Sequence, residues 1–516
     1  MSRFLFPILL LTIFFSFFRL GSVTLFDVDE AVFSEATKEM VESGNWITPT
    51  YNGENRYDKP ILFYWFMAVS YKIFGINEFG ARFPSAVASC LLMVALFFFA
   101  QRLQDEKTAL YATLPFVLSL SFFVYSHAAV TDMTLTLFIT LSLFSFYLSV
   151  SGEKGHSGRD AMYSYGFYLF SAFAFLTKGL IGVVFPFGIA LVYMIGTEKW
   201  SGIKKVFRLK GLILFSLVSA PWFIAQFSIN GREFFDQFIL KHHFRRYLGV
   251  ISGHKGPFYY YIPVLLIGLF PWIGYLPAGI RNTLKEKERL YLFALLWVAF
   301  IFVFFSFSTT KLPNYMLPAI PAVSLLIASG MEVKDKRWRQ FSHYFMATLA
   351  LLISAAFLIS SRYLAKFGID DFAWLYVLAA IPIAVVVLGV YSALTEKGFY
   401  IVLSGLMILF LSILSIKAMP VINNYLQGTL HQYSLYAKGR LSPDESVFVY
   451  GINNPSIAFY SGHKVITLRG KNDLKDLSHT VDHALLITKT KNIEIIENLG
   501  FHVLEKDERY AILERK

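Results

Sequence analysis

Three acidic residues follow the first apolar stretch of the chain and are the first candidates for chemistry. Asp27, Asp29 and Glu30 come directly after the apolar stretch of residues 4–25. A carboxylate within hydrogen-bond reach of a hydroxyl group can take its proton or orient it for attack. Acidic residues are also favoured in the first turn of a helix, and the apolar residues of 32–41 recur at helical spacing. The spacing leaves two interpretations open, a catalytic carboxylate and a helix cap.

A further acid, Asp132, stands at the start of the apolar stretch 132–150. An ionisable residue at the edge of a membrane segment is costly to place there and is therefore a candidate for function. Asp is also a favoured residue at a helix N-terminus, and position alone favours a cap over catalysis for Asp132.

Basic residues between the apolar stretches could recognise phosphate. Arginine provides bidentate contacts to a phosphate group and lysine provides a point charge. Each of these residues could instead extend its charged end to the lipid headgroups. The candidates are Lys59, Lys178, Arg245, Arg246 and Lys311.

A metal site is a weaker hypothesis. Asp58 and the pair His242 and His243 could supply a carboxylate and an imidazole to a divalent metal ion, but they lie in separate loops, which favours a structural histidine. The single cysteine, Cys90, lies inside an apolar stretch, so the sequence predicts no disulfide framework and no cysteine metal site.

The composition places these residues in a membrane protein. Of the 516 residues, 56% are hydrophobic and only 16% are charged, which exceeds what one soluble core of this length would bury. The net charge of +12 comes from short Lys and Arg clusters between apolar stretches rather than from one basic face, which argues against a nucleic-acid partner. About 20 apolar residues make one span. On that template the spans fall near 4–25, 79–102, 109–126, 132–150, 163–178, 180–196, 211–228, 258–279, 290–307, 313–331, 341–361, 372–394 and 399–417.

The basic clusters also predict the orientation of the chain. If Arg3 is cytoplasmic, every even-numbered connection carries Lys or Arg, as the positive-inside rule requires. The acids and the phosphate-binding candidates then share the external side. Two long loops, 27–77 and 229–257, lie on that side. We expect the first to hold an amphipathic helix on the membrane surface at 30–41 and a short interfacial helix at 60–74.

The composition changes to that of a soluble protein after residue 420. The stretches 446–450, 464–468 and 484–488 have the pattern of strands, with helix-like residues near Ile457 and Ile493. We therefore expect a transmembrane domain over residues 1–420 and a small external α/β domain over residues 421–516.

The order of these motifs resembles a known family. The segments are Asp29-Glu30-Ala31-Val32-Phe33-Ser34-Glu35-Ala36, Glu42 to Pro49, Tyr57-Asp58-Lys59-Pro60-Ile61, Thr131-Asp132-Met133, Leu176-Thr177-Lys178-Gly179, His243 to Leu248, Pro257 to Pro263 and Lys311 to Pro318. They cover about the first 330 residues, and their shared order makes the likeness specific. They resemble the GT-C glycosyltransferases, in particular the bacterial lipid A aminoarabinose transferases and, more distantly, the protein O-mannosyltransferases.

The resemblance implies a GT-C fold with thirteen membrane helices and a periplasmic carboxy-terminal domain. It also implies roles for individual residues. Asp29 would be the catalytic aspartate, with Glu30 beside it, and Asp132 the second essential acid. Lys59 would hold the carrier phosphate, with further contacts from Lys178 and an arginine of the pair Arg245 and Arg246. Tyr315 would belong to a loop over the donor, and Asp58 and His243 would hold a divalent metal ion.

Two positions depart from the family pattern. Val32 stands where the aminoarabinose transferases carry an arginine, which removes a cation near the donor and loosens the choice of sugar. Asp58 stands where those enzymes usually carry a glutamate, which weakens the metal hypothesis.

The expected activity is transfer of a sugar from a polyprenyl (undecaprenyl) phosphate carrier, with inversion, on the periplasmic side of a bacterial inner membrane. The expected partners are this donor, membrane lipids and an envelope acceptor such as lipid A, another glycan or a protein, and the chain is expected to be a monomer. The alternatives are a protein O-glycosyltransferase of the mannosyltransferase type and a polytopic lipid or solute transporter. A transporter would often show inverted repeats and broken helices near the midplane, whereas the acids here gather on one side.

Overall fold

The computed structural model describes residues 3–151, 157–238, 256–364, 373–395, 399–480 and 483–515. The predicted site residues His243, Arg245 and Arg246 lie outside these ranges. The chain divides into two compact units. The helical unit comprises Met1–Phe18, Tyr57–Phe63 and Pro84–Ala418, and the composite unit comprises Arg19–Arg56, Tyr64–Phe83 and Met419–Lys516.

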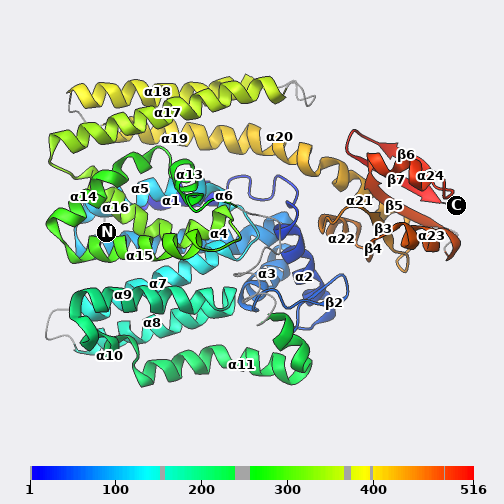
Figure 1. Cartoon of the computed structure of the whole chain (residues 1–516), viewed down its shortest axis with the longest axis horizontal. Helices are drawn as coiled ribbons and strands as arrows, with labels where there is room; N and C mark the ends of the chain where they lie inside the picture. Colours follow the sequence, from blue (N-terminus) through cyan, green and yellow to red (C-terminus); the bar gives the residue numbers. More distant parts are fainter. Residues whose placement is uncertain are drawn as a thin grey trace. The chain divides into compact units, whose positions relative to one another are not determined.

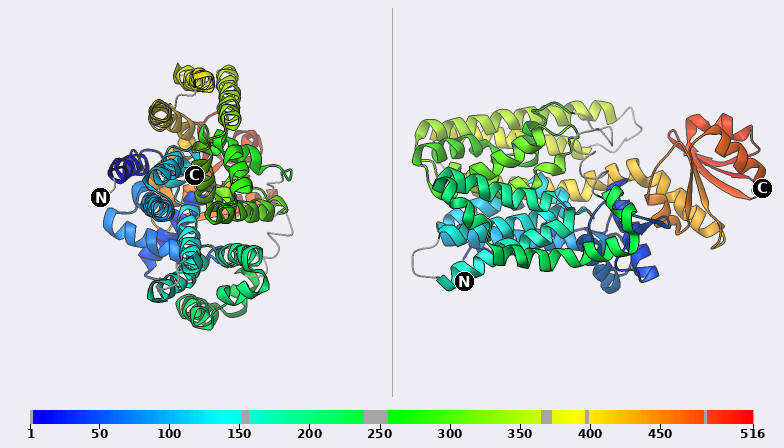
Figure 2. Two further views of the ribbon diagram at one scale, coloured as in Figure 1. Left: turned by 90° about the vertical axis from the view of Figure 1, so that its left-hand side faces the viewer. Right: turned by 60° about the horizontal axis from the view of Figure 1, so that its bottom comes forward.

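The helical unit is built from long apolar helices. Helices that follow one another in sequence pack side by side, as α7 with α8 and α17 with α18 (Figures 1 and 2). The helices are α1 (Leu5–Phe17), α4 (Glu78–Leu103, whose first residues belong to the composite unit), α5 (Glu106–Val117), α6 (Leu120–Ser126), α7 (Asp132–Ser151), α8 (Ser157–Lys178), α9 (Ile181–Glu198), η1 (Lys199–Gly202), α10 (Ile203–Val206), α11 (Leu209–Phe234), α13 (Tyr261–Gly268), η3 (Trp272–Tyr275), α14 (Leu276–Glu286), α15 (Arg289–Ser306), η4 (Pro313–Ala319), α16 (Ile320–Met331), α17 (Lys336–Leu364), α18 (Ala373–Thr395), α19 (Tyr400–Ile413) and η6 (Leu414–Ala418).

Within the described ranges, nine helices are long and apolar enough to cross a membrane, or eleven if each of two bent helix pairs counts as one span. All thirteen predicted ranges contain helix, but two do not meet this criterion. The range 4–25 contains α1, which has only 13 residues, and the range 163–178 lies in α8.

Two predicted spans are bent rather than straight. The range 109–126 is the pair α5 and α6, bent by 63°, and the range 258–279 falls in the pair Tyr261–Gly268 and Trp272–Glu286, bent by 113°. Ser119 explains the first bend, because its hydroxyl accepts from the Phe122 amide (3.1 Å) and donates to the Phe116 carbonyl (2.8 Å). Ser119 therefore ends one helix and starts the next.

The composite unit combines the first loop with the end of the chain. The first loop contributes α2 (Asp29–Ser43), the hairpin of β1 (Thr50–Tyr51) and β2 (Glu54–Asn55), and most of α3 (Leu62–Phe74). From the end of the chain come α20 (Met419–Asn423), η7 (Asn424–Gly428), α21 (Thr429–Arg440) and a five-stranded sheet with its helices.

Helix α2 confirms the predicted helix at 30–41. Its apolar residues Val32, Phe33, Ala36 and Met40 are buried, and polar residues on its other faces, including Thr37, are buried as well. Helix α2 is therefore packed on several sides within the composite unit, and its place at the membrane surface stays a prediction.

The sheet has the strand order β4-β3-β5-β7-β6, with β3 parallel to β4 and β5, and β7 antiparallel to β5 and β6. Its strands are β3 (Val447–Tyr450), β4 (Val465–Leu468), β5 (Ala484–Lys489), β6 (His502–Lys506) and β7 (Tyr510–Arg515). The three predicted strands are confirmed, and β6 and β7 are additional. Apolar residues of α21 and α22 (Ser456–Ser461) cover one face of the sheet, and those of α23 (Lys471–Thr480) and α24 (Ile493–Glu497) cover the other. The predicted small α/β domain is therefore present.

The hairpin of the first loop pairs with an edge of this sheet. The side-chain nitrogen of Asn52 donates to the backbone carbonyl of Val465 (2.6 Å), and the side-chain oxygen of Asn52 accepts from the backbone amide of Val465 (2.8 Å). Asn52 has φ +57° and Gly53 has φ +78°, which the tight turn between β1 and β2 requires. Because β4 is an edge strand, the Asn52 side chain replaces part of a neighbouring strand.

We predict that Asn52→Gly will loosen β4. Glycine tolerates the positive φ, so the substitution removes the two side-chain hydrogen bonds without adding backbone strain. Two net hydrogen bonds are worth about 1–3 kcal/mol. Hydrogen exchange of the β4 amides in the full chain should accelerate, and Asn498→Gly, at an exposed position of the same unit, should leave it unchanged. Equal exchange of β4 in both variants would contradict the pairing.

Candidate active site

In the helical unit, three elements bring polar side chains together around Asp132. Asp132 is the first residue of α7 and is 4% exposed. Its Oδ1 accepts from Lys178 Nζ (2.6 Å), at the end of α8, and from Asn314 Nδ2 (3.1 Å), in η4. Asp132 thus binds side chains of two other elements, which a helix cap alone would not do. Asn314 was not among the sequence candidates, although it lies in the motif that contains Tyr315.

Tyr315 borders the same cluster. Its ring stacks on Phe305 with 4.5 Å between the centroids, and Lys178 Nζ lies 6.0 Å from the centroid of the tyrosine ring. We call Asp132, Lys178, Asn314 and Tyr315 the Asp132 cluster. In the part of the chain that the structure describes, Asp132 is the sole hydrogen-bond partner of the Lys178 ammonium group. Two N–H groups of Lys178 therefore remain for an anionic ligand.

Lys311 has a different environment from Lys178. Its Nζ donates to the carbonyls of Phe305 (2.9 Å), Ser306 (2.7 Å) and Ser308 (2.7 Å), and its side chain is buried. Phe305 and Ser306 end α15 and Ser308 follows it, so Lys311 caps that helix. Burial lowers the pKa of Lys311. Because an ammonium group has three N–H donors, a phosphate could bind Lys311 only after one of these bonds broke.

Asp58 and Lys59 also belong to the helical unit, and both are half-buried. Lys59 Nζ donates to the Asp58 carbonyl (3.2 Å), and the preceding Tyr57 packs edge-on against Phe234 (5.6 Å). No group of three or more His, Cys, Asp and Glu side chains able to hold a metal ion occurs among the described residues. His243 lies outside them, so the metal pair of Asp58 and His243 stays a prediction.

In the composite unit, Asp29 and Glu30 have opposite environments. Asp29 is the first residue of α2 and is exposed, and its carboxylate has no hydrogen-bond or ion-pair partner within the described ranges. Glu30 is 5% exposed, receives two hydrogen bonds from Arg82 (2.9 and 2.8 Å), and accepts from the Phe26 amide (2.9 Å). Asp29 is thus the carboxylate available to a substrate, and Glu30 is an anchor.

Arg82, which lies inside the predicted span 79–102, was not among the sequence candidates. Its remaining N–H groups donate to the carbonyls of Leu20 (3.1 Å), Val23 (2.8 Å) and Thr24 (3.0 Å). An arginine within an apolar stretch is costly unless it is paired. Its presence in the predicted span could therefore have identified Arg82 as a candidate from the sequence.

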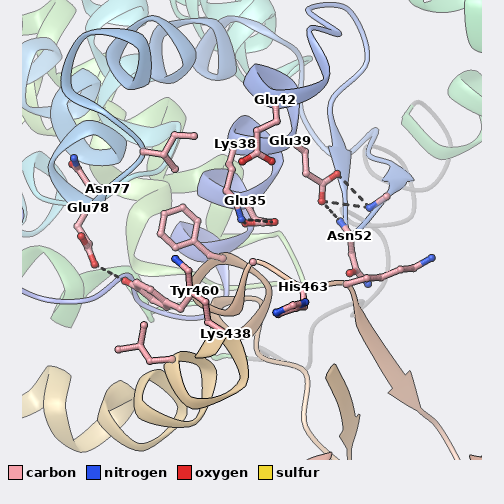
Figure 3. A pocket seen from close by; sticks show the side chains of 16 residues that line it. Glu35, Lys38, Glu39, Glu42, Asn52, Asn77, Glu78, Lys438, Tyr460 and His463 are labelled. Carbon is pink, nitrogen blue, oxygen red and sulfur yellow. Dashed lines mark hydrogen bonds and ion pairs between the residues drawn. The ribbon is translucent and has the colours of Figure 1, made fainter. Parts of the chain in front are cut away.

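The composite unit also contains a cavity of about 660 Å³ (Figure 3). Its charged lining comprises Glu35, Lys38, Glu39, Glu42, Glu78, Lys438, His463 and Lys464. Glu35 is 6% exposed and pairs with Lys38 (3.2 Å). Burial raises the pKa of Glu35 to about 7, against the opposing effect of the Lys38 charge.

Comparisons with known proteins place this geometry in a family. Residues 58–224 match the family model described as dolichyl-phosphate-mannose-protein mannosyltransferase. A protein of Aquifex aeolicus described as uncharacterized is 32% identical over 363 residues, which are 69% of each chain. The undecaprenyl phosphate-alpha-4-amino-4-deoxy-L-arabinose arabinosyl transferase of Aeromonas hydrophila is 32% identical over 64% of this chain and 61% of its own length. The crystal structure of ArnT from Cupriavidus metallidurans, bound to undecaprenyl phosphate, superimposes with a TM-score of 0.81 at 21% identity, over 99% of this chain and 98% of that one.

The chain belongs to the GT-C glycosyltransferases. This glycosyltransferase is an integral membrane protein, and the GT-C fold predicted from its motifs is confirmed over almost the whole chain. The sequence relatives align with about two thirds of it. The fold likeness covers 99% of the chain and therefore extends to the carboxy-terminal sheet.

We predict a pH-dependent stability that originates at Glu35. Between pH 4.5 and about 7 the folded glycosyltransferase binds more protons at Glu35 than the unfolded chain, so its stability falls as the pH rises through that window. The full effect is on the order of 3 kcal/mol. Glu35→Gln should remove this part of the slope when thermal unfolding in detergent is followed from pH 5 to pH 8.

Glu497→Gln provides the matched control, since Glu497 is an exposed glutamate of the same unit that does not line the cavity. The other charged groups that line the cavity, His463 included, are the same in all three proteins and cancel in the comparison. Parallel pH profiles for the wild type and Glu35→Gln would show that Glu35 does not carry the effect.

Proposed function

We propose that this glycosyltransferase transfers a sugar from an undecaprenyl-phosphate carrier to an envelope acceptor such as lipid A, on the periplasmic side of a bacterial inner membrane. The observation that carries the proposal is the Asp132 cluster, in which a carboxylate holds the ammonium group of Lys178 with donors to spare. A fixed cation of this kind suits the phosphate of a lipid carrier. The printed names of the relatives, which include an undecaprenyl phosphate-linked aminoarabinose transferase and an ArnT bound to undecaprenyl phosphate, support the same donor class.

The proposed reaction is a single displacement at the anomeric carbon. The acceptor oxygen forms a bond to that carbon as the bond to the carrier phosphate oxygen breaks, and the phosphate leaves with the electron pair. Asp29 orients the acceptor hydroxyl or takes its proton, because its carboxylate is exposed and unpaired in the described structure. Lys178 and Lys59, with Arg245 and Arg246 by family resemblance, offset the charge that grows on the phosphate.

Asp132 and Asn314 have supporting roles in this proposal. Asp132 holds Lys178 in place, and Asn314 fixes the same carboxylate oxygen. Glu30 acts through the backbone before Asp29 rather than on the substrate, since Arg82 occupies it. The product is expected to have inverted configuration, because one displacement inverts the anomeric carbon.

A protein acceptor is the second candidate. The matched family model is described as a protein mannosyltransferase and covers residues 58–224, which include Lys59, Asp132 and Lys178. The shared residues concern the donor side of the reaction, so both candidates use the same carrier chemistry and differ in the acceptor.

The decisive experiment offers the purified full chain undecaprenyl-phosphate donors that bear different sugars, 4-amino-4-deoxy-L-arabinose among them, with lipid A or peptides as acceptors. We expect product by mass spectrometry with one donor, and loss of at least ~100-fold in kcat for Asp29→Asn, the usual range for removal of a general base. Asp444→Asn is the matched control at an exposed position of the same unit. Unchanged activity in Asp29→Asn, or a product of retained configuration, would refute the mechanism.

We also predict that stability and activity separate at the Asp132 cluster. Lys178→Met leaves the buried Asp132 charge without its ion pair and should cost about 3–5 kcal/mol of stability. Adding Asp132→Asn removes that charge and should restore the melting temperature, while turnover stays low because the cation is still absent. Recovery of turnover together with stability would show that Lys178 has only a structural role.

A further inference from the structure

The segment 20–27 leads directly into α2 and is held by hydrogen bonds at successive residues. The composite unit contains this segment together with residues from the end of the chain. Thr24 exchanges three hydrogen bonds with the Asn423 side chain, through its amide (3.1 Å), its hydroxyl (2.9 Å) and its carbonyl (2.9 Å). The Leu25 amide donates to Tyr460 Oη (2.8 Å).

Tyr460 is itself fixed. It is 8% exposed, and its hydroxyl donates to Glu78 Oε1 (2.9 Å), at the start of α4, as the dashed line in Figure 3 shows. A hydroxyl that donates to Glu78 while it accepts from Leu25 has a defined position. The carboxy-terminal region thus sets the backbone at Leu25.

Asp27 makes the most extensive contact of the segment. Its Oδ1 accepts from the Ser456 amide (2.8 Å), and its Oδ2 accepts from Ser456 Oγ (2.6 Å) and Asn454 Nδ2 (2.9 Å). Burial raises the pKa of Asp27, while these hydrogen bonds oppose the rise. The partners lie more than 400 residues further along the chain, and Asp29 follows Asp27 by two residues.

The environment of Asp29 gives these contacts their significance. The Asp29 side chain has no partner among the described residues, so its position depends on the backbone that carries it. That backbone is anchored on one side by the Glu30–Arg82 pair and on the other by Asp27. A misplacement of 1 Å at a reacting group can cost roughly 100-fold in rate.

We propose that Asn454 and Ser456 of the carboxy-terminal region are positioning residues that act through Asp27 to place the Asp29 carboxylate for the transfer reaction. This inference rests on the proposed function, because it takes Asp29 as the catalytic carboxylate. It assigns the small α/β region a part in the chemistry that occurs at the first loop.

The test compares the double variant Asn454→Ala/Ser456→Ala with a matched double variant, Asn498→Ala/Ser434→Ala, in the full chain. Ser434 is buried in the same unit and donates to the Leu430 carbonyl, and Asn498 is exposed, so neither contacts segment 20–27. With the donor and acceptor found in the screen above, we expect kcat of the first double variant to fall by about 10–100-fold while KM for the donor changes by less than about twofold. Ser456→Thr keeps the amide and the hydroxyl and should retain activity.

Hydrogen exchange gives a readout that needs no substrate. Amides of residues 20–31 should exchange faster in Asn454→Ala/Ser456→Ala than in the matched variant, with β3 and β5 unchanged. Asp27→Asn is the second variant, for use if Asn454→Ala/Ser456→Ala does not fold. Its side-chain amide nitrogen would face the Asn454 donor, so it should also accelerate exchange at residues 20–31.

The outcomes separate the two proposals. If Asp29→Asn is inactive while Asn454→Ala/Ser456→Ala turns over normally, or if exchange at 20–31 is unchanged, the positioning role is refuted and the proposed function stands. If Asp29→Asn remains active, the proposed function itself fails. A matched variant that lost kcat equally would show a general effect of stability and would also overturn the positioning role.

Discussion

Arg82 is 1% exposed, and all five of its N–H groups are used. Two donate to Glu30 and three to backbone carbonyls of the segment before α2. A buried charge is tolerated only when its partners replace the lost water, and removing one partner leaves an uncompensated charge. The arginine therefore determines the path of the chain into α2. The exposed carboxylate of Asp29 depends on that path, as do the contacts that Asp27 makes.

Lys178 and Lys311 of the helical unit show why a cation in the right motif does not define a ligand site. Lys178 is held by one carboxylate, and Lys311 by three backbone carbonyls. The first arrangement leaves hydrogen-bond donors for a phosphate oxygen, and the second leaves none. The difference comes from where α15 ends relative to Lys311, and therefore from local backbone geometry rather than from charge.

The features that could be predicted from the sequence are those that repeat over a short distance. Apolar length located the membrane helices, alternation located β3, β4 and β5, and helical spacing located α2. The bend at Ser119, the pairing of Asp132 with Asn314, and the contacts of Asp27 with Ser456 involve single hydrogen bonds, most of them between distant residues. No periodic pattern encodes such bonds. Arg82 differs from these contacts, because a charged residue within an apolar stretch is costly and could have been recognised from the sequence.

The two edges of the carboxy-terminal sheet are protected in different ways. Strand β6 is largely exposed, carries His502, Glu505 and Lys506, and has an irregular register between Val503 and Glu505, features that discourage a further strand from adding to it. At β4 the Asn52 side chain already occupies the backbone groups of Val465. The hairpin of the first loop therefore shields a surface that would otherwise be open to intermolecular strand addition. A carboxy-terminal fragment produced without that loop would carry an unblocked edge and a tendency to self-associate.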